Sequence, residues 1–371
     1  MKISLLLAIL LCFSASACTP EAKKAGKTID EVEILDPSDP HPGGDDSADD
    51  VNVTQAMITT AGATELMVTK AAAYRKASMA AGKRNGVYVY DGASFTPYVS
   101  NPEKLAARIA MLGFKDVYLS PGKSRITEAS PALKRFIAAC SGYGISVYAV
   151  RISNLSVLVN PSEVNSEVSL ITSYNSKVAP NERFKGIAAD LEPHTAKGSA
   201  KPSGLQYTWD SNTNYGKGGD NDQLLHLTLD RLSAAGTQLH NGGLKLGEAI
   251  LYTYQRYFNQ GQLEYGSAPQ FLDACDFLII MAYVSTKEGS WSESLPCLQA
   301  ASSKPSSVSI CIKTRINEDS GTSIQAKGWN YLLETVKYLN QQGASQPAFR
   351  GVDMFTFDGI ETMWEWLNDK N

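Results

Sequence analysis

The sequence predicts an α/β fold, a (β/α)8 TIM barrel preceded by an N-terminal helical extension. Eight short apolar runs of strand character alternate with segments of helical periodicity over residues 85–371. Several helical segments end in a glycine close to the next strand, as at Gly113, Gly144 and Gly343, and glycine is a common helix terminus. The alternation indicates parallel strands, and eight parallel strands are the number that closes this barrel.

The elements follow one another in a regular order. The predicted strands are residues 87–90, 116–119, 146–152, 186–191, 244–251, 276–283, 308–312 and 351–357. Apolar spacing and start signals predict helices at residues 105–111, 133–139, 224–239, 329–339 and 360–367. An open, doubly wound sheet is the alternative. No G-x-G-x-x-G segment follows the first strand and no P-loop occurs, so a nucleotide-binding fold is disfavoured.

The N-terminus has the layout of a secretory signal. Lys2 precedes a short apolar run and small residues, and Cys18 follows them directly. This resembles a bacterial lipoprotein signal (residues 1–18), in which Cys18 is lipidated; an ordinary signal peptide cut near Cys18 is the alternative. We therefore expect a lipid-anchored protein of the cell envelope, at the outer membrane and facing the periplasm or the surface, with the lipid as its only contact with a membrane.

Two further segments precede the barrel. Residues 19–50 have no apolar periodicity, contain four prolines and end in an acidic run, which predicts a disordered tether. Residues 51–84 are rich in alanine and methionine and are predicted to form a helical segment that packs against the barrel (residues 85–371).

The composition argues against several classes of function. The net charge is −4 and the chain has no basic block, so nucleic acid is not expected as a partner. The spacing of Cys140, Cys275, Cys297 and Cys311 matches no zinc pattern. Cys275 and Cys297 either pair or remain buried thiols. We expect a monomer without a cofactor.

Two acids mark the end of the fourth predicted strand. Asp190 and Glu192 lie on the same face, ~7 Å apart along the chain, and Pro193 follows them. Burial and mutual repulsion are expected to raise the pKa of one carboxyl, as a general acid requires. Active sites of such barrels lie at the carboxyl ends of the strands. The alternative is a structural acid pair that caps the next loop or binds Lys185 or Arg183.

The segment after these acids is the longest loop on that face. Residues 195–222 contain Tyr207, Trp209 and Tyr215 among small and polar residues. These aromatic residues either form a wall of a saccharide cleft or pack the loop against the barrel. His194 extends the acid pair to D-x-E-x-H, but the barrel has only two other histidines, so no metal site is expected.

The fourth strand with Asp190 and Glu192, and the sixth with Met281-Ala282-Tyr283, together resemble the family-18 glycoside hydrolases. The resemblance implies a chitinase-like (β/α)8 enzyme that cleaves beside N-acetylhexosamine units. Glu192 is then the general acid/base, Asp190 orients the substrate acetamido group, which is itself the nucleophile, and the Tyr283 hydroxyl holds the acetamido oxygen.

The chain departs from the family pattern at three places. Lys185 and Ala188 stand where the family motif has acids, and the eighth strand presents Phe355 and Phe357 where the family usually has a tryptophan.

Other residues near strand ends are candidate substrate contacts. They are Tyr88, Tyr90, Trp209, Tyr252, Met281, Phe355 and Asp358. Lys313 and Arg315 end the seventh strand and either meet an anionic group or pair with Glu318. Glu248 is an alternative nucleophile, and a retaining enzyme of that kind would hold its two carboxyls about 5–5.5 Å apart.

These observations predict a lipid-anchored glycoside hydrolase that acts on an extracellular or periplasmic oligosaccharide or polysaccharide containing N-acetylhexosamine. The alternative is a glycan-binding lipoprotein that kept the barrel and lost the chemistry, which Ala188 favours and Asp190, Glu192 and Tyr283 oppose. A barrel without glycan contact is a third possibility, and it would require the aromatic residues of the 195–222 loop to be buried.

Overall fold

The structure is a computed structural model that describes residues 52–78, 83–210, 216–315 and 321–366. All of them belong to one compact unit, Ser47–Asn371. The predicted signal with Cys18, and the predicted tether, lie outside the described residues, as do Tyr215 and Glu318. In the part of the chain that is described, no helix combines the length and the apolar run needed to cross a bilayer.

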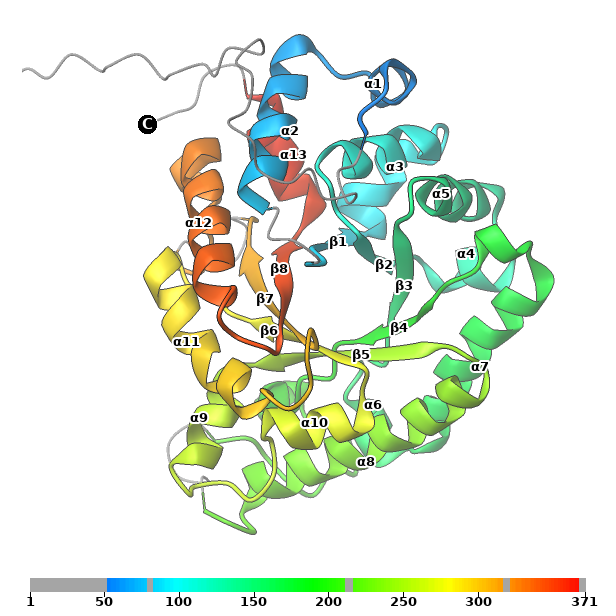
Figure 1. Cartoon of the computed structure of the whole chain (residues 1–371). Helices are drawn as coiled ribbons and strands as arrows, with labels where there is room; N and C mark the ends of the chain where they lie inside the picture. The colour runs from blue at the N-terminus through cyan, green and yellow to red at the C-terminus, as the bar shows by residue number, and fades with distance from the viewer. Residues whose placement is uncertain (1–51, 79–82, 211–215, 316–320, 367–371) are drawn as a thin grey trace, which may run out of the picture. The chain divides into compact units, whose positions relative to one another are not determined.

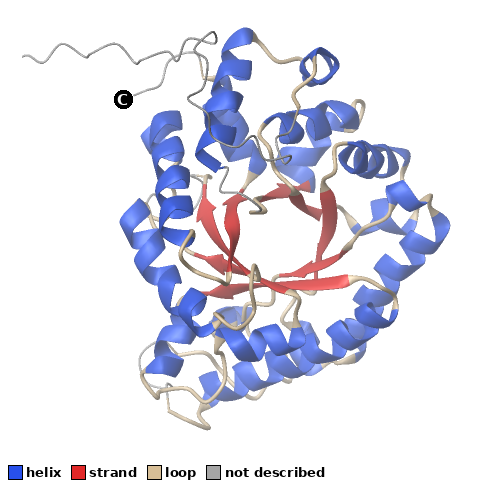
Figure 2. Cartoon of the chain, viewed as in Figure 1, coloured by secondary structure: helices blue, strands red, loops and turns tan. Residues whose placement is uncertain are grey.

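Eight parallel strands form a closed barrel in sequence order, and helices surround it (Figures 1 and 2). The strands are β1 (Gly86–Tyr90), β2 (Asp116–Ser120), β3 (Ser146–Arg151), β4 (Gly186–Ala189), β5 (Lys245–Leu251), β6 (Phe277–Met281), β7 (Val308–Lys313) and β8 (Phe349–Phe355). Closure between β1 and β8 confirms the predicted (β/α)8 barrel and excludes the open sheet.

Four strands, β3, β4, β6 and β8, end one or two residues earlier than predicted, and the ends of β4 and β6 matter for the site. β4 ends at Ala189, because the Leu191 N–H donates to the Glu248 side chain. β6 ends at Met281, where the chain begins to turn: the Ala282 N–H bonds to Ile280 O at 2.8 Å as well as to Cys311 O of β7 at 3.0 Å, and the Val284 N–H bonds to Ala282 O. Asp190, Glu192 and Tyr283 therefore lie just beyond the strands, where the chain turns.

The helices include all five that were predicted, and others that were not. They are α1 (Gln55–Ala61), α2 (Glu65–Ser78), α3 (Pro102–Met111), α4 (Lys123–Thr127), α5 (Pro131–Gly142), α6 (Ser156–Val159), α7 (Ser162–Lys177), α8 (Asp220–Asn241), α9 (Thr253–Asn259), α10 (Ala268–Ala274), α11 (Lys287–Ala300), α12 (Gly328–Gly343) and α13 (Phe357–Glu365). α7 is rich in serine and asparagine and α11 contains Pro296, which explains why their apolar spacing is weak.

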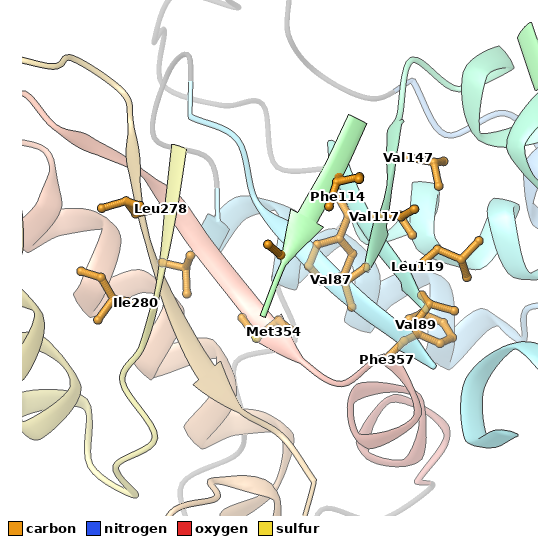
Figure 3. Packing of buried hydrophobic residues seen from close by; sticks show 14 of the residues in the cluster. Val87, Val89, Phe114, Val117, Leu119, Val147, Leu278, Ile280, Met354 and Phe357 are labelled. Atoms are coloured by element: carbon orange, nitrogen blue, oxygen red, sulfur yellow. The ribbon is translucent and has the colours of Figure 1, made fainter. Parts of the chain in front are cut away.

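Side chains alternate between two layers along each strand. Outward residues pack under the helices, and Figure 3 shows Val87, Val117, Leu278 and Met354 among them. Inward residues form a separate cluster that fills the barrel and is unusually aromatic. It contains Tyr88, Tyr118, Tyr148, Val150, Ala188, Ala249, Phe277, Ile279, Met281 and Cys311.

Glycines make room for these inward rings. A Cβ atom on Gly86 would lie 2.5 Å from the Tyr118 ring, and one on Gly247 would lie 2.2 Å from the Phe277 ring. Both separations are shorter than van der Waals contact, so each large ring depends on a glycine of a neighbouring strand. The barrel is therefore a packed core that offers a ligand access only at its mouth.

The amino-terminal ends of the strands are closed by a buried polar network. Asp116 accepts from Arg350 at 2.8 Å and from Arg84 at 2.6 Å, and Tyr118 receives a bond from Arg350 and donates to Asp353 at 3.0 Å. Burial raises the pKa of Asp353 to about 6 even though the Arg350 charge opposes this rise.

The helices α1 and α2 pack on the side of the barrel where the chain closes (Figure 1). Lys70 of α2 donates to the carbonyl of Trp366 at 2.7 Å, and the Trp364 indole donates to the Met67 carbonyl at 2.7 Å. The guanidinium of Arg108 on α3 donates to the carbonyl of Ala61 at 3.0 Å. The extension is thereby tied to α3 and to the C-terminal helix α13.

Candidate active site

The two acids lie at the mouth of the barrel, directly after β4. Asp190 continues the inward alternation of Gly186 and Ala188, and both acidic side chains remain partly exposed. Pro193 then begins a short helical turn that ends at Thr195. The Glu192 carbonyl accepts from the amide of Thr195 at 3.0 Å and from its hydroxyl at 2.7 Å. The turn therefore holds the backbone of Glu192 against the end of the strand.

Electrostatic interactions join these acids to residues of two other strands. Burial raises the pKa of Asp190 to about 6. The pKa values of Tyr90 and Tyr283 are raised by burial and by the charges of both Asp190 and Glu192, and that of Tyr88 by burial and Asp190. The three phenols therefore stay protonated at neutral pH beside the acids, and the Tyr283 hydroxyl also hydrogen-bonds with the Cys311 side chain.

A ring of aromatic side chains surrounds the same place. The Phe355 ring lies 5.5 Å from Tyr88, 5.7 Å from Tyr90 and 5.3 Å from Tyr283, measured between ring centroids. Met281 is buried in the inward cluster beneath these rings. The predicted contacts Tyr88, Tyr90, Met281 and Phe355 are thus gathered with the predicted catalytic residues.

Asp358 also lies at the mouth, where its oxygens are already engaged. It accepts from the Ser94 hydroxyl at 2.8 Å and from the Thr356 hydroxyl, and it forms an ion pair of 3.6 Å with Arg315. The Lys313 ammonium lies 5.9 Å from the centre of the Tyr283 ring. Lys313 therefore stands beside Tyr283 and Arg315 beside Asp358, and Asp358 links the start of α13 to the turn after β1.

Two predicted contacts lie elsewhere. Trp209 is only 4% exposed and packs on Tyr254 at 5.6 Å and on His194 at 6.4 Å, inside the hydrophobic core. The prediction of Trp209 as a cleft residue is therefore corrected. The 195–222 loop folds inward at this residue, and the Trp209 amide donates to the carbonyl of Ala196. Tyr252 directly precedes α9, and its ring lies 5.7 Å from the guanidinium of Arg256 on that helix.

His194 has a structural partner. Its Nδ1 lies 2.7 Å from the Tyr254 hydroxyl, and burial with the nearby Lys197 lowers its pKa to about 4. No three His, Cys, Asp or Glu side chains of the described residues lie where they would hold a metal ion. The four cysteines of the barrel are buried and unpaired, so the predicted alternative of a Cys275–Cys297 disulfide is not formed.

Glu248 does not line the mouth. It shares the outward face of β5 with Leu246 and Ile250, which pack in the layer between barrel and helices, and it is fully buried. Burial and the charges of Asp190 and Glu192 raise the pKa of Glu248 well above its usual value. A carboxyl that is buried in the layer between barrel and helices cannot reach a substrate at the mouth, which argues against the alternative role given to Glu248. Strand parity, counted from the inward Gly247 and Ala249, was the signal that could have shown this.

A hollow lies on the rim beside the acids' loop. Its volume is 580 Å³, and it is formed by the segment after β3 and the segment after β4, with Asn154, Ser156 and Lys201 among its lining residues.

Comparisons with known proteins place this geometry in context. No family model and no curated protein sequence matches the chain. Among solved structures, a GH18 chitinase from Pseudoalteromonas aurantia is similar with a TM-score of 0.50 and 14% identity, covering 76% of this chain and 97% of that one. The Bacillus cereus spore cortex-lytic enzyme SleL has a TM-score of 0.46 and 10% identity, with 82% and 84% covered. An endo-β-N-acetylglucosaminidase from Cordyceps militaris has a TM-score of 0.42 and 12% identity, with 79% and 86% covered. The chain therefore shares its barrel fold with a family-18 chitinase, as the resemblance of its fourth and sixth strands implies.

Proposed function

We propose that the protein is a glycoside hydrolase with Glu192 as its general acid/base and a glycan containing N-acetylhexosamine as its substrate. The observation that carries the proposal is the gathering of Asp190, Glu192 and Tyr283 at one mouth of the barrel, under a ring of aromatic side chains. The shared fold with a chitinase supports it at the level of architecture alone. Turnover of aryl glycosides and polymeric glycans by the wild-type protein and by Glu192→Gln is the test.

The proposed reaction assigns one task to each polar group. Glu192 gives its proton to the oxygen of the leaving sugar as the bond from that oxygen to the anomeric carbon breaks. The acetamido oxygen of the substrate forms the new bond to that carbon, and Glu192 then takes a proton from the water that replaces it. Asp190 accepts from the acetamido N–H, and the Tyr283 hydroxyl donates to the acetamido oxygen.

The aromatic residues suit the apolar faces of a sugar ring. Tyr90 and Phe355 are partly exposed at the mouth, whereas Tyr88 and Met281 are buried below them. A sugar that stacks on the upper rings would place its glycosidic oxygen beside the acids. Burial of apolar C–H surface contributes about 25 cal/mol per Å² to such binding.

The pH dependence of the reaction tests the role of Asp190. Its carboxyl must be ionised to accept from the acetamido N–H, and its pKa is raised to about 6. Since the group is protonated below that value, kcat/KM is expected to fall as pH decreases through about 6. Asp190→Asn should lower activity and remove this acidic limb from a profile measured between about pH 4 and about pH 8. A limb that persists with the same midpoint in Asp190→Asn would assign it to another group.

Replacing Tyr283 by phenylalanine tests the acetamido contact. Loss of one positioned hydrogen-bond donor is expected to lower kcat about 100-fold. The ring packing on Phe355 should remain, so thermal stability should change little. Tyr90→Phe is the matched control, because Tyr90 belongs to the same aromatic group and has no proposed bond to the acetamido. Equal effects of the two substitutions would argue against the assignment.

A glycan-binding protein without turnover is the second candidate. Ala188 favours it, because this inward, fully buried position holds a methyl group where the family motif places an acid beside Asp190. Binding of a glycan without hydrolysis, unchanged by Glu192→Gln, would establish this candidate.

We further propose that residues 1–18 direct the protein to the envelope, that Cys18 carries the lipid, and that residues 19–50 tether a monomeric barrel to it. The support is the order of basic, apolar and small residues before Cys18. A glycan would then be met outside the cytoplasm, on the periplasmic side or at the surface.

A further inference from the structure

A buried carboxyl lies directly behind the two acids of the candidate site. Glu248 of β5 has no exposed surface, and its Oε1 accepts from the Leu191 N–H at 3.2 Å. Its Oε2 is buried without a hydrogen-bond partner among the described residues. Leu191 is the residue between Asp190 and Glu192, so this single bond acts on the backbone that carries both acids.

Burying this group is costly, which calls for a physical reason. Leucine or isoleucine would suit the apolar layer formed by its neighbours Leu246 and Ile250. The titratable groups with which it interacts are Asp190, Glu192 and the Cys275 thiol. Burial, and the negative charges of the two acids, raise the pKa of Glu248 well above its usual value, although the bond from the Leu191 N–H opposes this rise. The Leu191 amide is therefore held by a buried carboxyl whose ionisation is disfavoured beside Asp190 and Glu192.

The two acids lie between the end of a strand and a proline. The β4 ladder ends at Ala189, and Pro193 has no N–H to donate. On the far side of the acids, the Glu192 carbonyl is fixed by Thr195. On the near side, the Leu191 N–H reaches the Glu248 side chain in place of a backbone carbonyl of β5. Without that acceptor, a buried N–H would be left unsatisfied, or the segment would move.

We propose that Glu248 is a positioning residue of the candidate site: its carboxyl holds the Leu191 amide and so fixes the spacing and direction of Asp190 and Glu192. The kinetic test of this inference rests on the proposed hydrolase function. Its structural test rests on the bond from the Leu191 N–H alone. Glu248 touches no substrate in this role and acts through the backbone alone.

Substitutions that keep or remove the acceptor test the proposal. Glu248→Gln keeps a carbonyl oxygen at the same place and is expected to retain kcat within about threefold. Glu248→Met fills the space without an acceptor and should lower kcat about 100-fold, the effect expected when a catalytic group is displaced by about 1 Å. KM should change much less, because the aromatic rings remain. Glu248→Asp withdraws the acceptor by one methylene and serves if the methionine variant does not fold.

Ile250→Val is the matched control, because Ile250 lies on the same face of the same strand. It should lower stability without lowering kcat. The amide exchange rate of Leu191, read by NMR, supplies a readout that needs no turnover: it should rise at least about tenfold in Glu248→Met, but not in Glu248→Gln or Ile250→Val.

The outcomes separate the two proposals. A wild-type protein without turnover refutes the hydrolase function, and the exchange rate of Leu191 then decides the positioning role by itself. Turnover that survives in Glu248→Met, equal losses in Glu248→Gln and Glu248→Met, or unchanged Leu191 exchange would each overturn the positioning role.

Discussion

Glu192→Gln is expected to lower kcat on a polymeric glycan about 10³-fold. A carboxamide keeps the size and the hydrogen-bonding shape of the side chain but has no proton to give to the leaving oxygen, and general acid catalysis contributes about 10² to 10⁴ in rate. The backbone of Glu192 is held by Thr195, and its side chain is partly exposed, so the variant should fold as the wild type does. Substrate affinity should change little.

The loss of activity in Glu192→Gln should also depend on the leaving group of the substrate. An aryl glycoside with a strongly acidic phenol leaves with little help from a proton, whereas a sugar alcohol needs nearly complete protonation. The loss in Glu192→Gln should therefore be much smaller for the activated aryl glycoside than for the glycan. A uniform loss over both substrates would indicate that Glu192 binds or positions the substrate and does not protonate it.

Glu288→Gln is the matched control for this experiment. Glu288 is an exposed acid in the first turn of α11, which follows the sixth strand, and it has no place in the proposed chemistry. The activity of the Glu288→Gln variant should equal that of the wild type. Unchanged turnover in Glu192→Gln would remove Glu192 from the mechanism. Binding of the glycan by wild type and variant alike, with no product after long incubation, would establish the binding protein instead.

Most of the fold could be predicted because the barrel repeats one local pattern eight times. The strands were visible as apolar runs between helical segments, and the observed strands begin within two residues of the predicted starts. Boundaries were wrong where a side chain replaces the backbone ladder, as at Leu191, since no local signal reports a partner 57 residues away. Helix α7 was missed because polar residues obscure its apolar face.

The site was predictable to the extent that strand parity places residues. Asp190, Tyr283, Tyr90 and Phe355 were expected near one mouth, and the structure gathers them there. Trp209 could not be placed, because a loop of almost thirty residues folds by long-range packing and carries no periodicity.

Arg350→Met is expected to lower the free energy of unfolding by about 3–5 kcal/mol, the cost of removing one partner from a buried ion pair. The Arg350 side chain is 5% exposed, lies 4.2 Å from the centre of the Phe277 ring and bonds to Asp116, which has no exposed surface. Methionine matches its volume approximately but leaves Asp116 with the Arg84 partner alone. Urea unfolding followed by tryptophan fluorescence measures the loss.

Two further variants decide whether the uncompensated charge causes this loss. Arg84→Met removes the other cation that pairs with Asp116. The Arg84 side chain is 42% exposed, so its removal should lower the free energy of unfolding by no more than about 1 kcal/mol. Adding Asp116→Asn to Arg350→Met should restore part of the lost stability, because the buried negative charge is then gone. A loss below about 1 kcal/mol in Arg350→Met, or no recovery in the double variant, would show that the network contributes packing and not charge compensation.

The pH dependence of the same variant follows from Asp353. In the folded protein the pKa of Asp353 is about 6, above the usual value for an aspartate, so ionisation of this carboxyl is disfavoured. Its contribution to stability therefore falls as pH rises from the usual aspartate pKa to about 6. Arg350 opposes this rise in pKa. Without it the folded pKa of Asp353 should move higher, and the loss of stability should extend to higher pH. Arg350→Met should therefore lose more stability than the wild type between about pH 6 and about pH 8, and Asp353→Asn in the same background should abolish that difference.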